Sequence, residues 1–180
     1  MGLVIHFNIN NKYNIMKKNF KYIVVILFVA AFTSCETEEG YEDFPVEKTS
    51  VNDMTGDWYV QTFIGDDLAL GYELITISNT ANDESAIQIF DHKNIWWFNT
   101  AVPANVGALS FEGNDLASDV DGYQITVNVT NGQIEKNGTV TSDTNLPADF
   151  ISFDIEFSDD PGTIYHIEGY KRSGFLEDEH

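Results

Sequence analysis

Apolar and polar residues alternate along much of the chain after Met54. In the clearest run, every second residue from Ile151 to Phe157 is Ile or Phe, and the residues between them are polar. Residues 123–130 repeat the pattern with Tyr, Ile and Val. A period of two gives a strand one buried face and one solvated face. Because no segment of this region keeps an apolar period of 3.6 residues, we expect a domain built from strands.

Turn-forming residues divide this region into short segments. Asn131-Gly132 is typical of a type I′ hairpin and predicts a turn between strands at residues 123–130 and 133–135. Asn137-Gly138 predicts a second turn. The remaining predicted strands cover residues 58–63, 72–78, 86–91, 95–99, 108–112, 150–158 and 163–170.

Short strands at close spacing, without helices, are typical of an antiparallel barrel or a sandwich. A closed barrel removes exposed strand edges, which favours it over the sandwich. We therefore expect an all-β fold, a single antiparallel up-and-down β-barrel of about eight strands over residues 52–180.

The N-terminal part has the pattern of an export signal. Basic residues at 17–21 precede eleven uncharged residues, Tyr22 to Phe32, and then the sequence Phe-Thr-Ser-Cys ending at Cys35. Eleven residues at about 1.5 Å each are too short for a hydrocarbon core of roughly 30 Å. Phe-Thr-Ser-Cys resembles the lipobox of bacterial lipoproteins, although Phe32 stands where Leu is usual. We expect residues 1–34 to be a signal peptide and Cys35, the only cysteine, to carry the lipid. An ordinary secreted protein with an incidental cysteine is the alternative.

Residues 1–15 precede the basic stretch and fit no signal peptide, so we expect translation to start at Met16. Residues 35–51 are acidic and lack core-forming periodicity, which predicts a flexible tether. The acidic run after Cys35 also resembles the surface-export signal of Bacteroidetes lipoproteins. We expect a lipoprotein of the outer membrane in the cell envelope, with either a surface-exposed domain or a plain spacer behind its anchor.

Charge excludes one class of partner. After Cys35 the chain holds five of its nine Lys and Arg residues and all 29 of its Asp and Glu residues, a net charge of about −24. Such a surface repels nucleic acids, so we expect no nucleic-acid partner.

Two short motifs resemble lipocalins. Gly56-Asp57-Trp58 stands at the head of the first predicted strand, and Lys171-Arg172 follows the last. Lipocalins carry Gly-x-Trp at that place, with a late Arg or Lys packed over the indole. The resemblance implies a lipocalin-like (calycin-like) barrel closed by a cation–π contact between Trp58 and Arg172.

A longer pattern is similar to one particular family. It combines the first-strand motif with further segments. These are Ile77-Ser78-Asn79-Thr80, Asn131-Gly132, residues 157–162 and residues 169–175. Together they resemble the Bacteroidetes lipoprotein family labelled "lipid-binding putative hydrolase", from about Val51 to Asp178. The resemblance implies a barrel that holds a lipid or another apolar ligand, and it supplies no catalytic residues.

Candidate catalytic groups are few. There is no Gly-x-Ser-x-Gly motif, and the histidines after Cys35 are His92, His166 and His180. His166 is either a general base or an ordinary strand residue, and His92 falls in a predicted turn. Asp154 and Glu156 share a strand face that we expect to be solvated, and no His and Cys cluster or calcium-loop spacing indicates a metal. We therefore expect no cofactor and no metal, and the sequence favours a binding protein over an enzyme.

Aromatic residues are the strongest functional signal. Ile95-Trp96-Trp97-Phe98 puts bulky groups on both faces of a predicted strand, which indicates either a central core strand or a ligand site. The residues predicted to line a ligand cavity are Trp96, Trp97, Phe98, Tyr165 and His166. Three functions follow: binding of a small apolar ligand such as a lipid, capture of glycans at the cell surface, or an esterase using His166. We expect a monomer.

Overall fold

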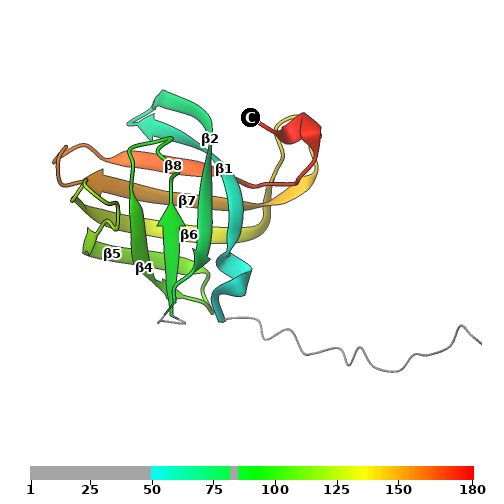
Figure 1. Cartoon of the computed structure of the whole chain (residues 1–180). Helices are drawn as coiled ribbons and strands as arrows, with labels where there is room; N and C mark the ends of the chain where they lie inside the picture. The colour runs from blue at the N-terminus through cyan, green and yellow to red at the C-terminus, as the bar shows by residue number, and fades with distance from the viewer. Residues whose placement is uncertain (1–49, 82–84) are drawn as a thin grey trace, which may run out of the picture. The chain divides into compact units, whose positions relative to one another are not determined.

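The computed structural model describes residues 50–81 and 85–180, so the predicted signal peptide, Cys35 and residues 36–49 of the predicted tether lie outside the described residues. The last two tether residues, Ser50 and Val51, lie in a 3-10 helix, and Val51 is fully buried, so the ordered domain begins slightly before the predicted residue 52. Eight strands form one closed antiparallel barrel in chain order, with β8 paired to β1 (Figure 1). The predicted all-β up-and-down barrel is confirmed. The strands are β1 (Gly56–Ile64), β2 (Asp67–Asn79), β3 (Ala86–Phe90), β4 (Asn99–Asn105), β5 (Ser110–Ala117), β6 (Thr126–Val140), β7 (Pro147–Phe157) and β8 (Tyr165–Lys171). Short 3-10 helices, η1 (Ser50–Met54) and η2 (Leu176–Asp178), precede and follow them. Within the described ranges, no helix has the length and apolar content needed to cross a membrane.

The predicted alternation defines the barrel interior. Ile151, Phe153, Ile155 and Phe157 on β7 are at most 1% exposed, as the sequence pattern predicts. Every other strand also turns apolar side chains inward, and an eight-stranded barrel is narrow enough for side chains to fill. Buried examples from the other seven strands are Val60, Ile75, Ile89, Val102, Phe111, Val129 and Ile167.

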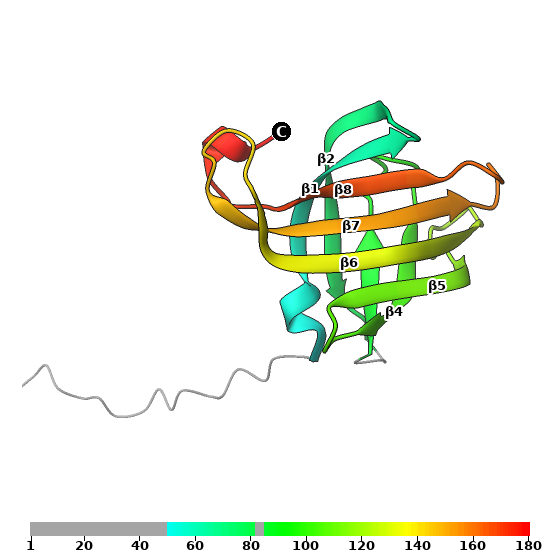
Figure 2. The ribbon, with the colours of Figure 1, turned by 180° about the vertical axis from the view of Figure 1, so that it is seen from behind.

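The two predicted Asn-Gly turns are wrong. β6 runs continuously through both sites, as the long strand in Figure 2 shows. Asn131 and Asn137 instead adopt left-handed conformations, with φ of 56° and 52°, next to register shifts in the β6–β7 ladder. An extra residue with this conformation makes a β-bulge, which bends a strand and suits a barrel wall. Only glycine fits at position 132, because a Cβ there would lie 2.2 Å from the carbonyl oxygen of Phe111 on the neighbouring strand.

The strand predicted over residues 95–99 is also wrong. β4 begins only at Asn99, and residues 91–98 form the connection from β3. The aromatic run therefore lies in a loop, held by contacts that the apolar pattern does not encode.

Barrel closure uses a different cation from the predicted one. Lys171 pairs with Trp58 across the β8–β1 seam, and its Nζ lies 5.7 Å from the centroid of the Trp58 ring. Arg172, the next residue, binds Asp57 and Glu179 instead, so its predicted contact with Trp58 is wrong. Gly56 leaves room for the lysine, because a Cβ there would lie 2.7 Å from Cε of Lys171.

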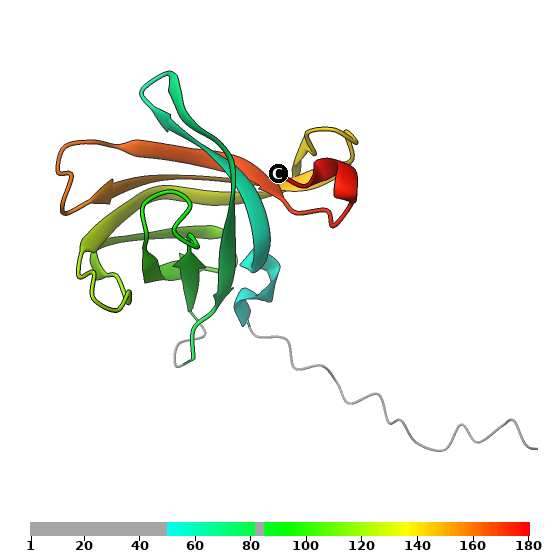
Figure 3. The same ribbon diagram turned by 45° about the horizontal axis from the view of Figure 1, so that its top comes forward.

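The connections divide between two ends of the barrel. Those joining β1 to β2, β3 to β4, β5 to β6 and β7 to β8 lie at one end, here called the aromatic end (Figure 3). The opposite end carries the β6–β7 connection and the segment after β8, residues 172–180, and is here called the C-terminal end.

Candidate functional site

The β3–β4 connection at the aromatic end is organised by one carboxylate. Asp91 is fully buried at the end of β3 and accepts hydrogen bonds from five backbone N–H groups. The donors are Lys93, Ile95, Trp96, Trp97 and Phe98, at N···O distances of 2.8–3.3 Å. A buried charge needs such partners. The aspartate therefore folds the whole loop around itself and fixes where the aromatic side chains point.

The same loop has unusual backbone angles. His92 and Lys93 have φ of 52° and 69°, and Trp97 has φ of 105°. Positive φ is unfavourable for residues with a Cβ, and most unusual for a bulky one. Such conformations persist only where surrounding contacts enforce them, and they occur often at functional sites. The Asp91 hydrogen bonds supply that enforcement.

Three of the predicted ligand residues meet around Phe157 of β7. Trp96 stacks on the Phe157 ring at a centroid distance of 4.8 Å, and Phe98 lies 5.6 Å from the same ring inside the core. Tyr165 of β8 turns inward and lies 5.5 Å from Phe157 and 5.4 Å from Trp96. Its hydroxyl donates to Asp160 at 2.7 Å, and burial together with this hydrogen bond raises the pKa of Tyr165 to about 12.

Trp97 lies beside this group rather than in it. Its ring stacks on Tyr123 of the β5–β6 connection, with centroids 5.7 Å apart and an interplanar angle of 14°. Lys93 Nζ lies 4.2 Å from the centroid of the Trp97 ring. Asp159 links the two aromatic groups, because it accepts hydrogen bonds from the Tyr123 hydroxyl and from Trp96 Nε1. The hydrogen bond to Asp159, with burial second, raises the pKa of Tyr123. Three connections are thereby tied together.

Aliphatic side chains are exposed at the same end. Ile64 is 44% exposed and pairs with Tyr165 across the β1–β8 seam, and Ile164, 50% exposed, immediately precedes that tyrosine. Leu68, in the adjoining β1–β2 hairpin, is 55% exposed. Exposed aliphatic side chains and half-buried aromatic rings therefore occur at the same end of the barrel.

The interior beneath contains unpartnered polar atoms. The indole N–H of Trp58 and the hydroxyl of Thr62, both on the inward face of β1, are buried and have no hydrogen-bond partner in the described part of the chain. Thr62 lies two residues from Ile64, so its hydroxyl faces the core just below the aromatic end.

His166 is not part of the aromatic group. It lies on the outer face of β8, where Nδ1 is 2.7 Å from Asp154 and Nε2 is 3.4 Å from Glu168. Burial lowers the pKa of His166, but the hydrogen bonds to these carboxylates outweigh burial and raise it. For Asp154, burial is outweighed by hydrogen bonds from Asn131 and His166, which lower its pKa. Both imidazole nitrogens face carboxylates, so no hydroxyl nucleophile is bonded to this histidine.

The His92 imidazole contacts a threonine hydroxyl. Its Nε2 lies 2.8 Å from Thr76 Oγ1, which also donates to Asp57 at 2.7 Å. A carboxylate only accepts, so the single Thr76 proton is directed to Asp57 and the imidazole must donate to Thr76. A general base needs the opposite arrangement.

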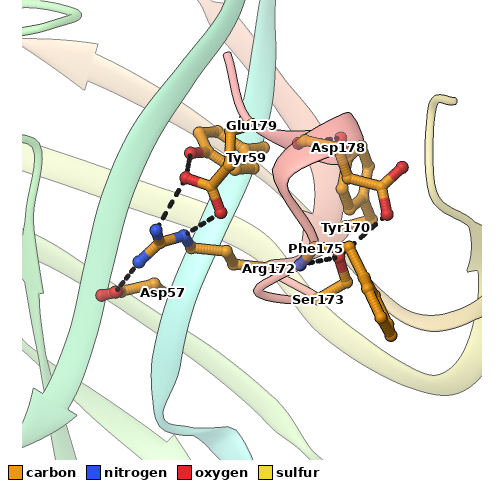
Figure 4. A network of polar contacts seen from close by, with 8 residues as sticks. All are labelled: Asp57, Tyr59, Tyr170, Arg172, Ser173, Phe175, Asp178 and Glu179. Atoms are coloured by element: carbon orange, nitrogen blue, oxygen red, sulfur yellow. Dashed lines mark hydrogen bonds and ion pairs between the residues drawn. The ribbon is translucent and has the colours of Figure 1, made fainter. Parts of the chain in front are cut away.

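A second cluster of aromatic rings and carboxylates covers the outer face near the C-terminal end (Figure 4). We call it the C-terminal network. Arg172 donates to Glu179 through Nε at 2.8 Å and Nη2 at 2.6 Å, and the Tyr59 hydroxyl donates to the same carboxylate at 2.7 Å. The Tyr170 hydroxyl lies 2.8 Å from His180 Nε2.

Asp178 anchors this network to the β6–β7 connection. It is 1% exposed and accepts hydrogen bonds from the Thr144 hydroxyl and N–H, the Asp143 N–H and the Ser173 hydroxyl. Burial would raise the pKa of Asp178, but these bonds outweigh burial and hold its pKa well below the usual range. The sequence pattern indicated none of these contacts, because Asp143 and Thr144 lie 35 and 34 positions from Asp178, and the nearer bond from Ser173 follows no strand period.

An open groove of about 700 Å³ lies over β4, β5 and β6. Its polar side chains are Asn105, Ser110, Glu112, Asn131 and Gln133, and its one aromatic residue, Phe111, is 2% exposed. Within the described ranges, no group of three or more His, Cys, Asp or Glu residues is placed to hold a metal ion.

Comparison with known proteins gives one match. Residues 43–176 match the model of a family described as "Lipid-binding putative hydrolase", which covers most of the chain and nearly all of the barrel. No curated protein matches the sequence.

Proposed function

We propose that this chain, which belongs to the family described as "Lipid-binding putative hydrolase", binds a lipid or another small apolar ligand at the aromatic end of its barrel. We propose further that a lipid on Cys35 tethers it to the outer membrane. The family and the barrel fit a lipid-binding protein.

The choice of site rests on two features that occur together at the aromatic end: exposed aliphatic side chains and the half-buried rings of Trp96 and Trp97. The C-terminal end also exposes apolar side chains, but its rings Tyr59 and Tyr170 are buried.

Ile64, Leu68 and Ile164 are each more than 40% exposed at the aromatic end, and Ile64 pairs with Tyr165, whose ring lies 5.4 Å from that of Trp96. Contiguous exposed apolar surface with a polar rim is typical of ligand and partner sites. Apolar side chains pack the core beneath this end, so we propose that the ligand enters by displacing rings there.

A lipid tail placed against Trp96 removes aliphatic and aromatic surface from water together. Each buried methylene contributes about 0.8 kcal/mol, so a tail of a few carbons is enough to offset the cost of moving a side chain. Thr62 supplies a hydroxyl beneath this site that lacks a partner in the described residues. The Thr62 hydroxyl can form a hydrogen bond with a polar group of the bound ligand.

Binding is tested with the full-length chain and a dodecyl amphiphile below its micelle concentration, by isothermal titration calorimetry. Leu68→Gln is expected to weaken binding several-fold, because it replaces one of the exposed aliphatic side chains at the aromatic end with an amide. Leu176→Gln is the matched control: Leu176 is 87% exposed at the C-terminal end, so the same change there leaves affinity unchanged. Equal effects of both variants, or no binding by the parent chain, contradict the proposed site.

The tether is tested separately. Intact mass spectrometry of the chain from host membranes should show a lipid on Cys35 as the first residue, and Cys35→Ser should release the protein from the membrane fraction. Retention of Cys35→Ser in that fraction is evidence against the anchor.

Glycan capture is the second candidate, because the groove over β4–β6 offers hydrogen-bonding side chains. Sugar sites usually add an exposed aromatic face, and Phe111 is too buried to provide one. The same calorimetry with oligosaccharides is expected to give no binding.

A further inference from the structure

We infer that the ligand of the aromatic end carries a cationic head group, and that an ammonium group takes the place of Lys93 on the face of Trp97. This inference rests on the proposed function and narrows it to amphiphiles with an ammonium head. The proposed site for the head group is the stacked pair of Trp97 and Tyr123, where Lys93 already lies over the Trp97 ring.

The stacked rings of Trp97 and Tyr123 form the surface that receives the cation. Trp97 and Tyr123 stack at 5.7 Å, and Lys93 Nζ lies 4.2 Å above the Trp97 centroid. Indole and phenol faces attract cations through the ring quadrupole, and aromatic sites of this type bind quaternary ammonium ligands. The contact with Lys93 demonstrates that this face of Trp97 is accessible to a positive charge. Because Lys93 is exposed and belongs to the same loop, it can swing away.

Hydrogen bonds hold both rings of the pair in a fixed position. Trp97 has φ of 105°, a conformation that its hydrogen bond to the buried Asp91 enforces. Tyr123 is fixed from the other side, because its hydroxyl donates to Asp159. The two rings are therefore held in place before any ligand arrives, which lowers the cost of binding.

The connections around the rings carry mostly negative charge. Of the four Lys and Arg residues in the described ranges, only Lys93 lies in a connection at the aromatic end. Solvent-accessible acidic residues are frequent in the same connections: Asp66, Asp119, Asp121, Asp159 and Asp160. Surfaces lined by one sign of charge attract ligands of the opposite sign and repel like charges. A fatty-acid anion is therefore disfavoured here, whereas an ammonium head is attracted.

Asp159 connects the proposed site of the head group to the proposed site of the tail. Asp159 receives Trp96 Nε1 at 3.1 Å as well as the Tyr123 hydroxyl, so the cation-binding rings and the apolar group around Phe157 share one carboxylate. A ligand with its head on Trp97 thus has its tail beside Trp96 and the exposed Ile164. This arrangement fits a single-chain amphiphile with an ammonium head.

The experiment compares head groups on one tail. The full-length chain with Cys35→Ser, which removes a competing lipid, is titrated calorimetrically with dodecyltrimethylammonium, dodecyl maltoside and dodecanoate below their micelle concentrations. Tetramethylammonium serves as the head without a tail. We expect the cationic amphiphile to bind at least five-fold more tightly than the neutral one, and dodecanoate to bind most weakly.

Each other outcome has a defined meaning. If no dodecyl compound binds, the proposed function fails together with the inference. If dodecyl maltoside or dodecanoate binds as tightly as the cation, the proposed function stands and the inference is overturned. If tetramethylammonium binds as tightly as its dodecyl derivative, the ligand is a free amine rather than an amphiphile, and the inference is also overturned.

Lys93→Ala gives the most specific test, because it removes the competing cation and should tighten binding of dodecyltrimethylammonium several-fold. A merely structural role for Lys93 predicts unchanged or weaker binding. Lys136→Ala is the matched control, since Lys136 binds Asp149 and the Asp53 carbonyl near the other end. Weaker binding by Lys93→Ala, or equal tightening by both variants, overturns the assignment of the Trp97 face.

Discussion

The aromatic end and the C-terminal network contain the same kinds of groups but satisfy them differently. In the C-terminal network, Tyr59 and Tyr170 are at most 4% exposed, and carboxylates meet a guanidinium, hydroxyls and N–H groups (Figure 4). At the aromatic end, Trp96 and Trp97 are only partly buried, and one lysine accompanies several aspartates. Apolar side chains are exposed at both ends, so the state of the rings and of the charges makes the difference.

Backbone conformation differs in the same direction. The β3–β4 connection holds three residues other than glycine at positive φ, one of them Trp97. At the C-terminal end, residues 171–180 have a positive φ only at Gly174, and the β6–β7 connection only at Asn145, a residue type that tolerates this conformation. Strain and unsatisfied surface lower stability, and they persist where binding needs them. The comparison supports our proposal that the ligand binds at the aromatic end, whereas the C-terminal network stabilises the barrel. Four predictions test this division, from the largest expected effect to the smallest.

Asp91→Ala is expected to lower the free energy of unfolding by about 3–5 kcal/mol, because five backbone N–H groups lose their acceptor. Chemical denaturation measures the loss. Asp119→Ala, at the same end but exposed, should change stability by less than about 0.5 kcal/mol. Comparable losses in both variants would contradict the organising role of Asp91.

Gly169→Ala is expected to cost about 2–3 kcal/mol and to loosen the β1–β8 seam. A Cβ at this position would lie 2.0 Å from the carbonyl oxygen of Tyr59, so the backbone of one strand must move. The thermal midpoint reports the effect. Gly71→Ala, where no atom lies within 4 Å of the added carbon, should leave the midpoint nearly unchanged.

The same hydroxyl deletion at the two ends compares them directly. Tyr170→Phe should cost about 1–2 kcal/mol, because its buried hydroxyl contacts Ser142, His180 and the Asp178 carbonyl. Tyr123→Phe should cost less than about 0.5 kcal/mol, because its bond to Asp159 lies at an exposed site. Ligand affinity should change in the opposite order. Equal stability losses from the two variants would remove the distinction between the ends.

His166 gives the smallest expected effect. Its pKa is raised above the ordinary 6.5, so its bonds to Asp154 and Glu168 stabilise the fold below pH 6.5. This contribution is lost as the pH rises through the raised pKa. We expect a loss of less than about 1 kcal/mol between pH 6 and 9, since the side chain is 42% exposed. Urea unfolding across this range, with His166→Gln as control, measures it; a stability that rises with pH would reverse the sign.

Much of the fold follows from local pattern. Alternation along residues 150–158 correctly predicted which side chains of β7 are buried, because a strand has a fixed period of two. The left-handed preference of Asn131-Gly132 suits a hairpin turn and a bulge equally, and only the neighbouring strands decide between them. The aromatic run was placed on a strand because the residue that shapes it, Asp91, acts through its side chain and has no periodicity.

The sequence by itself determined the fold class, the buried faces, the acidic surface and the candidate aromatic residues. These follow from composition and from periods that repeat within a few residues. Only the tertiary structure decided that Trp96, Phe98 and Tyr165 meet at one end, and that His166 lies outside. It also selected Lys171 over Arg172 for Trp58, because strand register sends adjacent side chains to opposite faces. Register and barrel closure join residues separated by many tens of positions, and no local pattern contains that information.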